Sequence, residues 1–355
     1  MNKIILTGGG TAGHVNPNLA LVPRLQQTGW QIEYIGSQTG IERQLVTTAG
    51  IPYHSIASGK LRRYFDWQNL VDPFKVVKGI ADAYMVLARV KPNLVFSKGG
   101  FVTVPVVLAA WLQRIPVIIH ESDFSPGLAN RLALPFASKV CITFPETQKF
   151  IPQAICTGLP IRAEVLGGDR AQGQKICGFK DDLPVLLVIG GSLGSAKLNQ
   201  AIRQILPQLL SQYQVVHLCG QGHFAPNLVG QPGYIQFEYL HQDLAHIYAL
   251  ADLVVSRAGA NAIFELVSLA KPHLLIPLSL QSSRGDQILN ANSFAAQGYS
   301  RVLAEEQLVN CEDLLGAIAD LSRDQARLIA GMRASQFISS IDKIIQLICQ
   351  TAQGE

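Results

Sequence analysis

The stretch that decides the fold lies near the N-terminus, where residues 4–17 read IILTGGGTAGHVNP. An apolar strand, residues 4–7, runs into a glycine turn, residues 8–13, and the spacing predicts a helix over about 17–27 and a further strand over 31–35. Glycines let backbone amides approach an anion, and a helix start carries partial positive charge. The pattern indicates a phosphate-binding turn, with a tight turn that binds no ligand as the alternative.

The same order of elements returns about 180 residues later. An apolar strand, 185–189, is followed by a glycine turn, 190–194, a helix expected over about 195–210 and a strand over 214–218. Alternating strands and helices are typical of a parallel sheet with helices on both faces. The sequence therefore predicts an α/β protein with two Rossmann-like, doubly wound parallel-sheet domains.

Glycines and prolines interrupt the hydrophobic periodicity between the two copies. We expect an N-terminal domain at 1–157, a linker at 158–182 and a C-terminal domain at 183–355. Residues 325–350 have a helical pattern. This last helix is a candidate for packing back on the N-terminal domain.

Composition excludes several classes of protein. The 355 residues are 48% hydrophobic and 15% charged, which is enough apolar material for buried cores and excludes disorder, collagen and coiled coil. Residues 1–160 carry 15 basic and 8 acidic side chains, a net of +7, whereas 161–355 carry 14 and 17, a net of −3. The six cysteines have no zinc-type spacing. We predict no metal, no cofactor and no membrane-spanning helix.

The charge excess of the first half suggests an anionic partner. That partner is either nucleic acid or an acidic lipid surface. In residues 60–78, basic side chains alternate with aromatic and aliphatic ones, a combination that suits anionic lipid headgroups with apolar side chains at the interface. An ordinary amphipathic helix with a basic loop is the alternative. We predict that this segment binds a membrane surface.

Polar side chains follow several predicted strands, where open α/β sheets bind ligands. In the first half, His14 is the candidate general base, although a lone histidine is more often structural. Residues 97–101 also follow a predicted strand, as does the loop that contains His120 and Glu121. We expect both to line the ligand-binding cleft at the sheet edge. His120 and Glu121 are further catalytic candidates. The alternative is that they form a pair that holds their own loop in place.

In the second half, Ser192 lies in the glycine turn, where a diphosphate could be held. Glu265 is expected inside a helix, with a carboxylate able to accept both hydroxyls of a ribose. Asp286 and Gln287 can bond to sugar hydroxyls. Since the chain has no Asp-x-Asp, a leaving diphosphate would be stabilised by helix starts, Ser192 and a cation such as Arg162.

Taken together, seven blocks of sequence resemble the MurG family of peptidoglycan N-acetylglucosaminyltransferases, most closely its branch in low-GC Gram-positive bacteria. In chain order they are GGGTAGHVNPNLAL, SGKLRRY, SKGGFVTVPVV, HESDFSPGLANR, GGSLGSAKLN, SRAGANAIFE and SRGDQILNAN. The resemblance implies a GT-B fold with two domains facing a cleft. It implies transfer of N-acetylglucosamine from UDP-N-acetylglucosamine to the C4 hydroxyl of the undecaprenyl-linked acceptor lipid I, which forms lipid II.

The resemblance also implies where the enzyme works and with what. It places a peripheral protein on the cytoplasmic side of the cell membrane, active in peptidoglycan synthesis and hence in cell shape and division. Its expected partners are the nucleotide sugar, lipid I, the anionic membrane and cell-wall or division proteins, with no nucleic acid.

Residue by residue, the resemblance assigns two groups of contacts. Arg162, Ser192, Asp286 and Gln287 match positions at the nucleotide sugar, Glu265 matches the ribose ligand, and Leu240 lies near the position whose backbone contacts uracil. Thr11, Ala12, Gly13 and His14 match the turn for the acceptor diphosphate and the reacting hydroxyl. The chain departs from the family pattern at Ala12, at 122–123 and at Asp286.

Three alternatives stay open at this stage. A UDP-N-acetylglucosamine 2-epimerase would share the donor site but needs no lipid surface. A dinucleotide-dependent oxidoreductase is disfavoured because no acidic residue stands at the tip of the second strand: Glu33 lies inside it and Glu42 comes after it. A non-catalytic scaffold that binds a UDP-sugar is the third.

Overall fold

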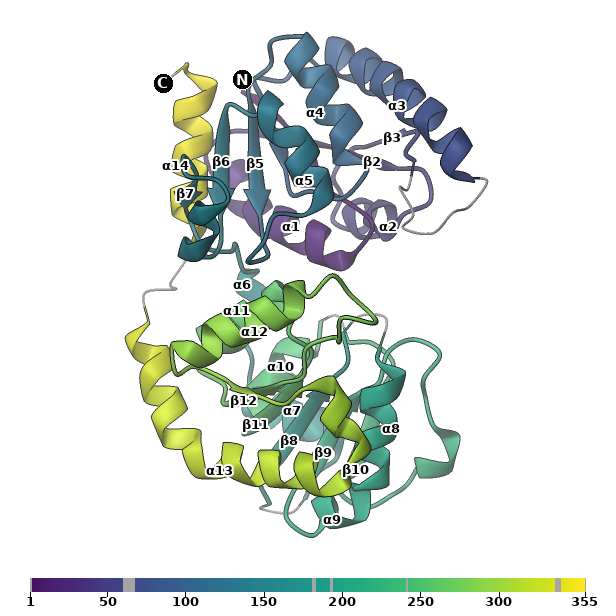
Figure 1. Ribbon diagram of the computed structural model, residues 1–355, viewed down its shortest axis with the longest axis vertical. Coiled ribbons are helices and arrows are strands. Elements are labelled where there is room, and N and C mark those ends of the chain that lie inside the picture. The colour runs from purple at the N-terminus through teal and green to yellow at the C-terminus, as the bar shows by residue number, and fades with distance from the viewer. Residues whose placement is uncertain are drawn as a thin grey trace. The chain divides into compact units, whose positions relative to one another are not determined.

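The computed structural model describes residues 2–59, 68–180, 183–191, 194–240, 242–335 and 340–354, with the backbone alone over 68–73. The chain forms two compact units (Figure 1). One consists of Met1–Arg162 with Ser339–Glu355, and the other of Ala163–Ile338. The first unit therefore ends inside the stretch expected to be a linker, and the C-terminal residues return to it.

The N-terminal unit is built on a seven-stranded sheet in the order β3-β2-β1-β4-β5-β6-β7, with every pair parallel. The strand order reverses between β1 and β4, which is where doubly wound sheets bind ligands. The strands are β1 (Lys3–Thr7), β2 (Gln31–Ser37), β3 (Tyr53–Ile56), β4 (Leu94–Ser97), β5 (Val117–Glu121), β6 (Lys139–Ile142) and β7 (Ile155–Cys156).

Side chains alternate between the two faces of this sheet, so each face has its own core. Ile4 and Leu6 pack under α1, whereas Ile5 points to the opposite face and packs with α3 and α4. The helices of this unit are α1 (Ala12–Gln27), α2 (Ile41–Thr48), α3 (Gln68–Val90), α4 (Thr103–Leu112), α5 (Leu128–Ala133), the 3-10 helices η1 (Leu134–Phe136) and η2 (Pro145–Lys149), and α14 (Ser340–Ala352).

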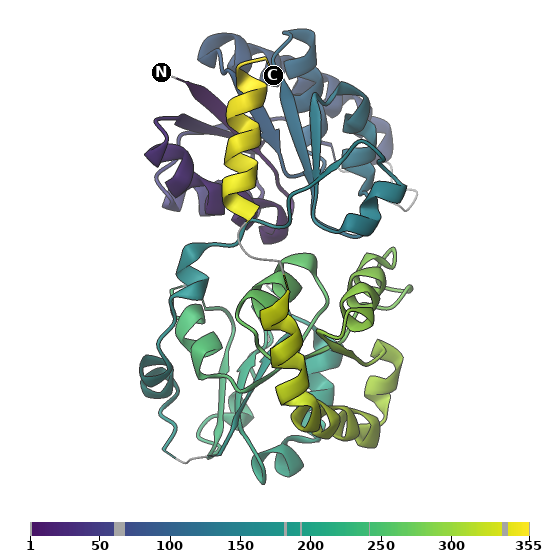
Figure 2. The same ribbon diagram turned by 90° about the vertical axis from the view of Figure 1, so that its left-hand side faces the viewer.

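Helix α14 comes from the end of the chain but belongs to the N-terminal core. Ile344, Leu347 and Ile348 are buried against residues of β1, β4 and α1, and Arg24 of α1 pairs with Asp342. Figure 2 shows this helix in yellow along the N-terminal sheet. One face of that sheet is thus covered by residues more than 300 positions apart in the sequence.

The C-terminal unit repeats the plan with a six-stranded parallel sheet in the order β10-β9-β8-β11-β12-β13. Its strands are β8 (Val185–Ile189), β9 (Gln214–Leu218), β10 (Tyr234–Phe237), β11 (Leu253–Ser256), β12 (His273–Leu275) and β13 (Arg301–Val302). Its helices are α6 (Ala163–Leu166), α7 (Arg170–Cys177), α8 (Ala196–Gln204), α9 (Leu206–Leu210), α10 (Leu244–Leu250), α11 (Ala260–Ser268), α12 (Asp286–Ala296), α13 (Cys311–Ala334), and the 3-10 helices η3 (Pro226–Leu228) and η4 (Glu305–Val309).

The helical stretch expected at 325–350 falls on two helices, because α13 ends at Ala334 and α14 begins at Ser340. Two further helix predictions were wrong because of a proline. Helix α1 begins at Ala12 and not near Pro17, since a proline there removes only the hydrogen bond that the Gly13 carbonyl would accept. The expected helix 195–210 is broken into α8 and α9, and Pro207 lies at the start of the second piece, where its missing N–H is tolerated.

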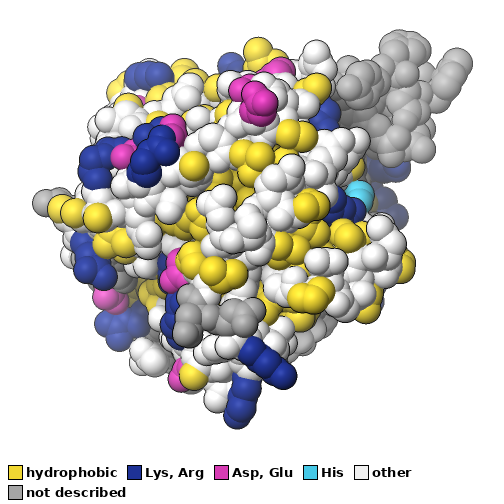
Figure 3. Space-filling model, turned by 90° about the horizontal axis from the view of Figure 1, so that it is seen from below, with side chains coloured by type: hydrophobic (Ala, Val, Ile, Leu, Met, Phe, Trp, Pro, Cys, Tyr) yellow, Lys and Arg dark blue, Asp and Glu magenta, His cyan; other side chains and the backbone are white. Residues whose placement is uncertain are grey.

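The surface of the described residues mixes chemical types. In the view of Figure 3, hydrophobic side chains form several groups among polar ones, and Lys and Arg lie mainly toward the edges. None of the described helices combines the length and the apolar character that crossing a membrane requires.

Candidate active site

The first glycine turn joins β1 to α1 at the switch point of the N-terminal sheet. A Cβ atom on Gly8 would lie 2.7 Å from the carbonyl oxygen of His14 and 3.2 Å from Cβ of Lys98. The amide of Gly9 donates to the carbonyl of Gly99, which follows β4. Only residues without side chains let the helix start and the loop after β4 approach this closely.

Glu42 lies directly beneath this turn and is fully buried. Its carboxylate accepts hydrogen bonds from the amides of Gly10 and Ser37, each 3.1 Å long. The Gly10 amide is therefore committed to a carboxylate. A bound anion would meet the first turn of α1 instead of this amide, and the engaged carboxylate is unsuited to a nucleotide ribose.

The predicted acceptor residues lie at that first turn of α1. Thr11 precedes the helix in an extended conformation, and its carbonyl accepts a bond from the His14 amide. Ala12 and Gly13 begin the helix, and the His14 side chain is partly exposed. The structure thus brings these four residues to the carboxyl edge of the sheet.

His120 is held within the N-terminal unit. Its ring is fully buried, Nδ1 lies 2.8 Å from Nζ of Lys98, and Nε2 lies 2.8 Å from the carbonyl oxygen of Gly158. Burial, together with the charge of Lys98, lowers the pKa of His120 well below its usual value. This arrangement is at odds with the predicted catalytic role, because both nitrogens already have partners and the ring does not reach the surface.

Glu121 is also engaged internally and is only 4% exposed. Its carboxylate accepts bonds from the amides of Asp123 and Gly127 and from the side chain of Asn130. These bonds fix the loop after β5. The geometry therefore favours the alternative in which His120 and Glu121 hold the loop.

The second glycine turn follows β8 at the switch point of the C-terminal sheet. Ser192 falls outside the described residues, so its predicted phosphate contact has no structural account. The turn ends at Ser195, whose hydroxyl caps α8 by accepting a bond from the Leu198 amide. That hydroxyl also accepts a bond from the guanidinium of Arg257, which follows β11.

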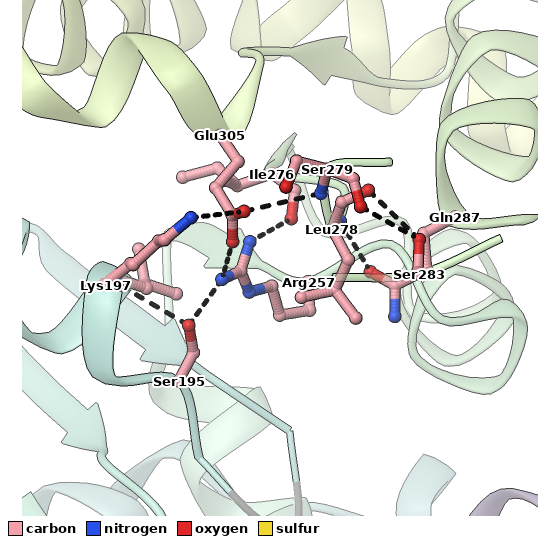
Figure 4. A network of polar contacts seen from close by, with 10 residues as sticks. Ser195, Lys197, Arg257, Ile276, Leu278, Ser279, Ser283, Gln287 and Glu305 are labelled. Atoms are coloured by element: carbon pink, nitrogen blue, oxygen red, sulfur yellow. Dashed lines mark hydrogen bonds and ion pairs between the residues drawn. The ribbon is translucent and has the colours of Figure 1, made fainter. Parts of the chain in front are cut away.

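Arg257 and Glu305 form the centre of a buried polar network (Figure 4). Their side chains are 8% and 2% exposed, and one carboxylate oxygen lies 2.5 Å from Nη2 of the arginine. Lys197 reaches the other oxygen at 3.1 Å, as does the amide of Ser279 at 3.4 Å. Burial alone would raise the pKa of Glu305, but the hydrogen bonds from Ser279, Arg257 and Lys197 lower it to about 2.

The network ties together loops that carry the predicted donor contacts. Gln287, at the start of α12, accepts a bond from the amide of Leu278 in the loop after β12 through its side-chain oxygen. Asp286 pairs with Arg284 at 3.5 Å. Glu265 lies on α11 and accepts a bond from the hydroxyl of Tyr248.

Arg162 and Leu240 are the remaining two predicted donor residues. Arg162 is the last residue of the N-terminal unit's main segment. Leu240 follows β10 and packs against the core of the C-terminal unit. Their predicted contacts stay predictions.

Sequence reasoning missed four residues of this framework: Glu42, Lys98, Arg257 and Glu305. Lys98 and Arg257 stand in quoted motifs directly after strands, so their position was a usable signal. Glu305 carries no such signal, because its partner Arg257 is 48 residues away. Glu42 bonds to nearby Ser37, but its bond to Gly10 spans 32 residues. Among the described residues, no three His, Cys, Asp or Glu side chains cluster as metal ligands do.

Two parallel sheets, each with a glycine turn at its switch point, define the GT-B class of glycosyltransferases. Residues 4–142 match the glycosyltransferase family 28 N-terminal domain, and residues 185–348 match the family 28 C-terminal domain. The chain belongs to glycosyltransferase family 28 and, within it, to the MurG family.

Individual proteins that are similar to this chain show which members of the family it resembles. The chain is 53% identical over 352 residues to the UDP-N-acetylglucosamine--N-acetylmuramyl-(pentapeptide) pyrophosphoryl-undecaprenol N-acetylglucosamine transferase of Clostridium perfringens, covering 99% of this chain and 98% of that protein. It is similar to the crystal structure of Acinetobacter baumannii MurG, with a TM-score of 0.76 and 25% identity over 99% of this chain and all of the other. A UDP-GlcNAc 2-epimerase from Neisseria meningitidis shares the fold alone, with a TM-score of 0.69, 14% identity, and 99% and 100% of the two chains covered.

Proposed function

We propose that this protein transfers N-acetylglucosamine from UDP-N-acetylglucosamine to the C4 hydroxyl of lipid I, forming lipid II for peptidoglycan. The observation that carries the proposal is 53% identity along nearly the whole chain to a transferase named for this reaction. The glycine turns at both switch points support it, since donor and acceptor each contain a diphosphate.

In this proposal each unit binds one diphosphate. Thr11, Ala12 and Gly13 meet the acceptor diphosphate, and His14 removes the proton from the attacking hydroxyl, so that the anomeric centre inverts. The donor is bound by residues of the second turn and its neighbours, with no metal required. These are Arg162, Ser192, Leu240 through its backbone, Glu265 at the ribose, and Asp286 and Gln287 at the sugar.

A transfer assay with a soluble lipid I analogue tests the function. We expect UDP release that requires the acceptor, together with a disaccharide product. UDP release without acceptor, or conversion of the donor to its 2-epimer, would favour the epimerase. Binding of the donor without release of UDP would favour a non-catalytic scaffold. Binding of NAD in preference to the UDP-sugar would favour an oxidoreductase.

We also propose that the N-terminal unit rests on the cytoplasmic side of an anionic membrane, where cell-wall or division proteins could reach it. Residues 60–67 of the predicted membrane segment lie outside the described residues. Beyond them, α3 and α4 carry exposed apolar side chains, called here the apolar patch: Phe74 is 76% exposed, Met85 63% and Trp111 52%. Lys78 on α3 and Arg114, two residues after the end of α4, are also exposed. Apolar side chains flanked by cations suit a membrane interface.

Replacing both Phe74 and Trp111 by Ser should weaken binding to phosphatidylglycerol vesicles about tenfold or more, because each apolar side chain loses its burial in the interface. Vesicle sedimentation measures the effect. Val309→Ser is the control, since Val309 is 88% exposed but lies on η4 of the other unit. Equal binding by the double variant and the wild type would refute the assignment of this patch.

A further inference from the structure

We propose that Lys98 is a positioning residue for the transfer reaction: it holds the loop after β5 in place beside the first glycine turn. The proposal rests on the function proposed above. It adds a residue to which neither motif nor resemblance gave a role.

Lys98 stands where three loops meet. Its amide donates to the carbonyl of Thr7 at 2.9 Å, which extends the pairing of β4 with β1. Its Cβ lies against Gly8 of the glycine turn. Its ammonium group lies 2.8 Å from Nδ1 of His120 and 2.6 Å from the hydroxyl of Ser122. The side chain thus joins the turn after β1 to the loop after β5.

These contacts determine the state of His120. The carbonyl of Gly158 can only accept, so the proton of the neutral His120 ring lies on Nε2. Nδ1 is then an acceptor and receives the bond from Nζ of Lys98. Ser122, Lys98, His120 and Gly158 therefore form one chain of hydrogen bonds that leads from the loop after β5 to the segment after β7.

The position of Lys98 is costly for folding. The side chain is fully buried, and the two hydrogen-bond partners that the described residues give its ammonium group are both uncharged. Burial lowers the pKa of Lys98 to about 7, against the opposing influence of Glu121, Asp123 and Cys141. Since a buried charge without an ionic partner is unfavourable, a methionine of similar length should be tolerated or preferred for stability. We therefore explain the presence of a lysine here by its role in holding the loop after β5, and not by a contribution to stability.

The test is the variant Lys98→Met. Its kcat is compared with that of the wild type per folded molecule, with each protein assayed the same number of degrees below its own Tm. We expect kcat for the lipid I analogue to fall about tenfold or more, because a small misplacement of the loop costs much in rate. The KM for UDP-N-acetylglucosamine should change less than about twofold, since all the proposed donor contacts except Arg162 belong to the other unit. Tm should be unchanged or higher. Histidine NMR should show the Nε2–H form of His120 in both proteins, because Gly158 still accepts its proton, and a shifted Nδ1 resonance in the variant, because that nitrogen loses its donor.

Lys271→Met is the matched control. Lys271 is a partly buried lysine of the C-terminal unit, and its ammonium group donates to the carbonyls of Ala249 and Ala251. This variant should lower Tm and keep kcat. Unchanged kcat in Lys98→Met would overturn the proposal, as would an equal loss of kcat in the control. Failure of both Lys98→Met and Lys98→Gln to fold would make Lys98 a structural residue and overturn it too. A wild type without transfer would instead refute the proposed function.

Discussion

Replacing Glu305 by Ala is expected to lower the free energy of unfolding of the C-terminal unit by about 3 to 5 kcal/mol. The carboxylate is almost fully buried and is the anionic partner of Arg257 in the described structure. Without it, the guanidinium stays buried next to Ser195 with its charge uncompensated. The decrease in the free energy of unfolding arises mainly from this buried, unpaired charge of Arg257.

Hydrogen exchange of the β8 and β11 amides is the suitable measurement. The tryptophans, Trp30, Trp67 and Trp111, all belong to the N-terminal unit, so their fluorescence does not report on the other one. Glu306→Ala removes the neighbouring exposed glutamate and should change stability by less than about 0.5 kcal/mol. Similar losses in both variants would show that the network is not the cause.

The same carboxylate predicts a pH dependence. Its pKa falls from 4.5 to about 2 on folding, so the stabilisation by its charge is fully present above pH 4.5 and is lost as pH falls through 2. This contribution amounts to roughly 3 kcal/mol. The stability difference between wild type and Glu305→Ala should therefore shrink steadily between these two pH values.

Replacing His14 by Ala is expected to lower kcat about 10²- to 10⁴-fold, the usual contribution of a general base. The KM for UDP-N-acetylglucosamine should change less than about threefold, because the proposed donor contacts are elsewhere. Steady-state kinetics with the lipid I analogue separate the two parameters.

His54→Ala is the control for His14, since His54 belongs to the same unit but pairs with Glu33 on β2 and β3. It should leave kcat near the wild-type value. A His14→Ala variant with wild-type turnover would remove this residue from the mechanism.

The sheets were predictable because buried parallel strands are continuous apolar runs. The strands 185–189 and 214–218 have the predicted bounds. Helix boundaries at proline were not predictable, since α1 continues through Pro17 and Pro23 whereas Pro207 lies at the start of a new helix. Pro17 and Pro207 differ in this respect, and neither the spacing nor the composition around them distinguishes the two cases.

The site was predictable only where a residue directly follows a strand. That rule placed three residues near the sheet edges, although His14 and Gln287 lie in the first turns of α1 and α12 and His120 lies within β5. It could not indicate that His120 faces inward, because this depends on Lys98, 22 residues away. Likewise, Glu305 pairs with Arg257 across 48 residues. Such pairs are decided by tertiary packing and leave no local pattern.

Helix α14 has a consequence for how the protein is made. The side of the N-terminal sheet that it covers is assembled from β1 and α1 and from Ile344, Leu347 and Ile348, which are synthesised more than 300 residues later. Until α14 has been synthesised, that apolar surface lacks this cover. The N-terminal unit therefore completes its folding only after the whole C-terminal unit has been synthesised.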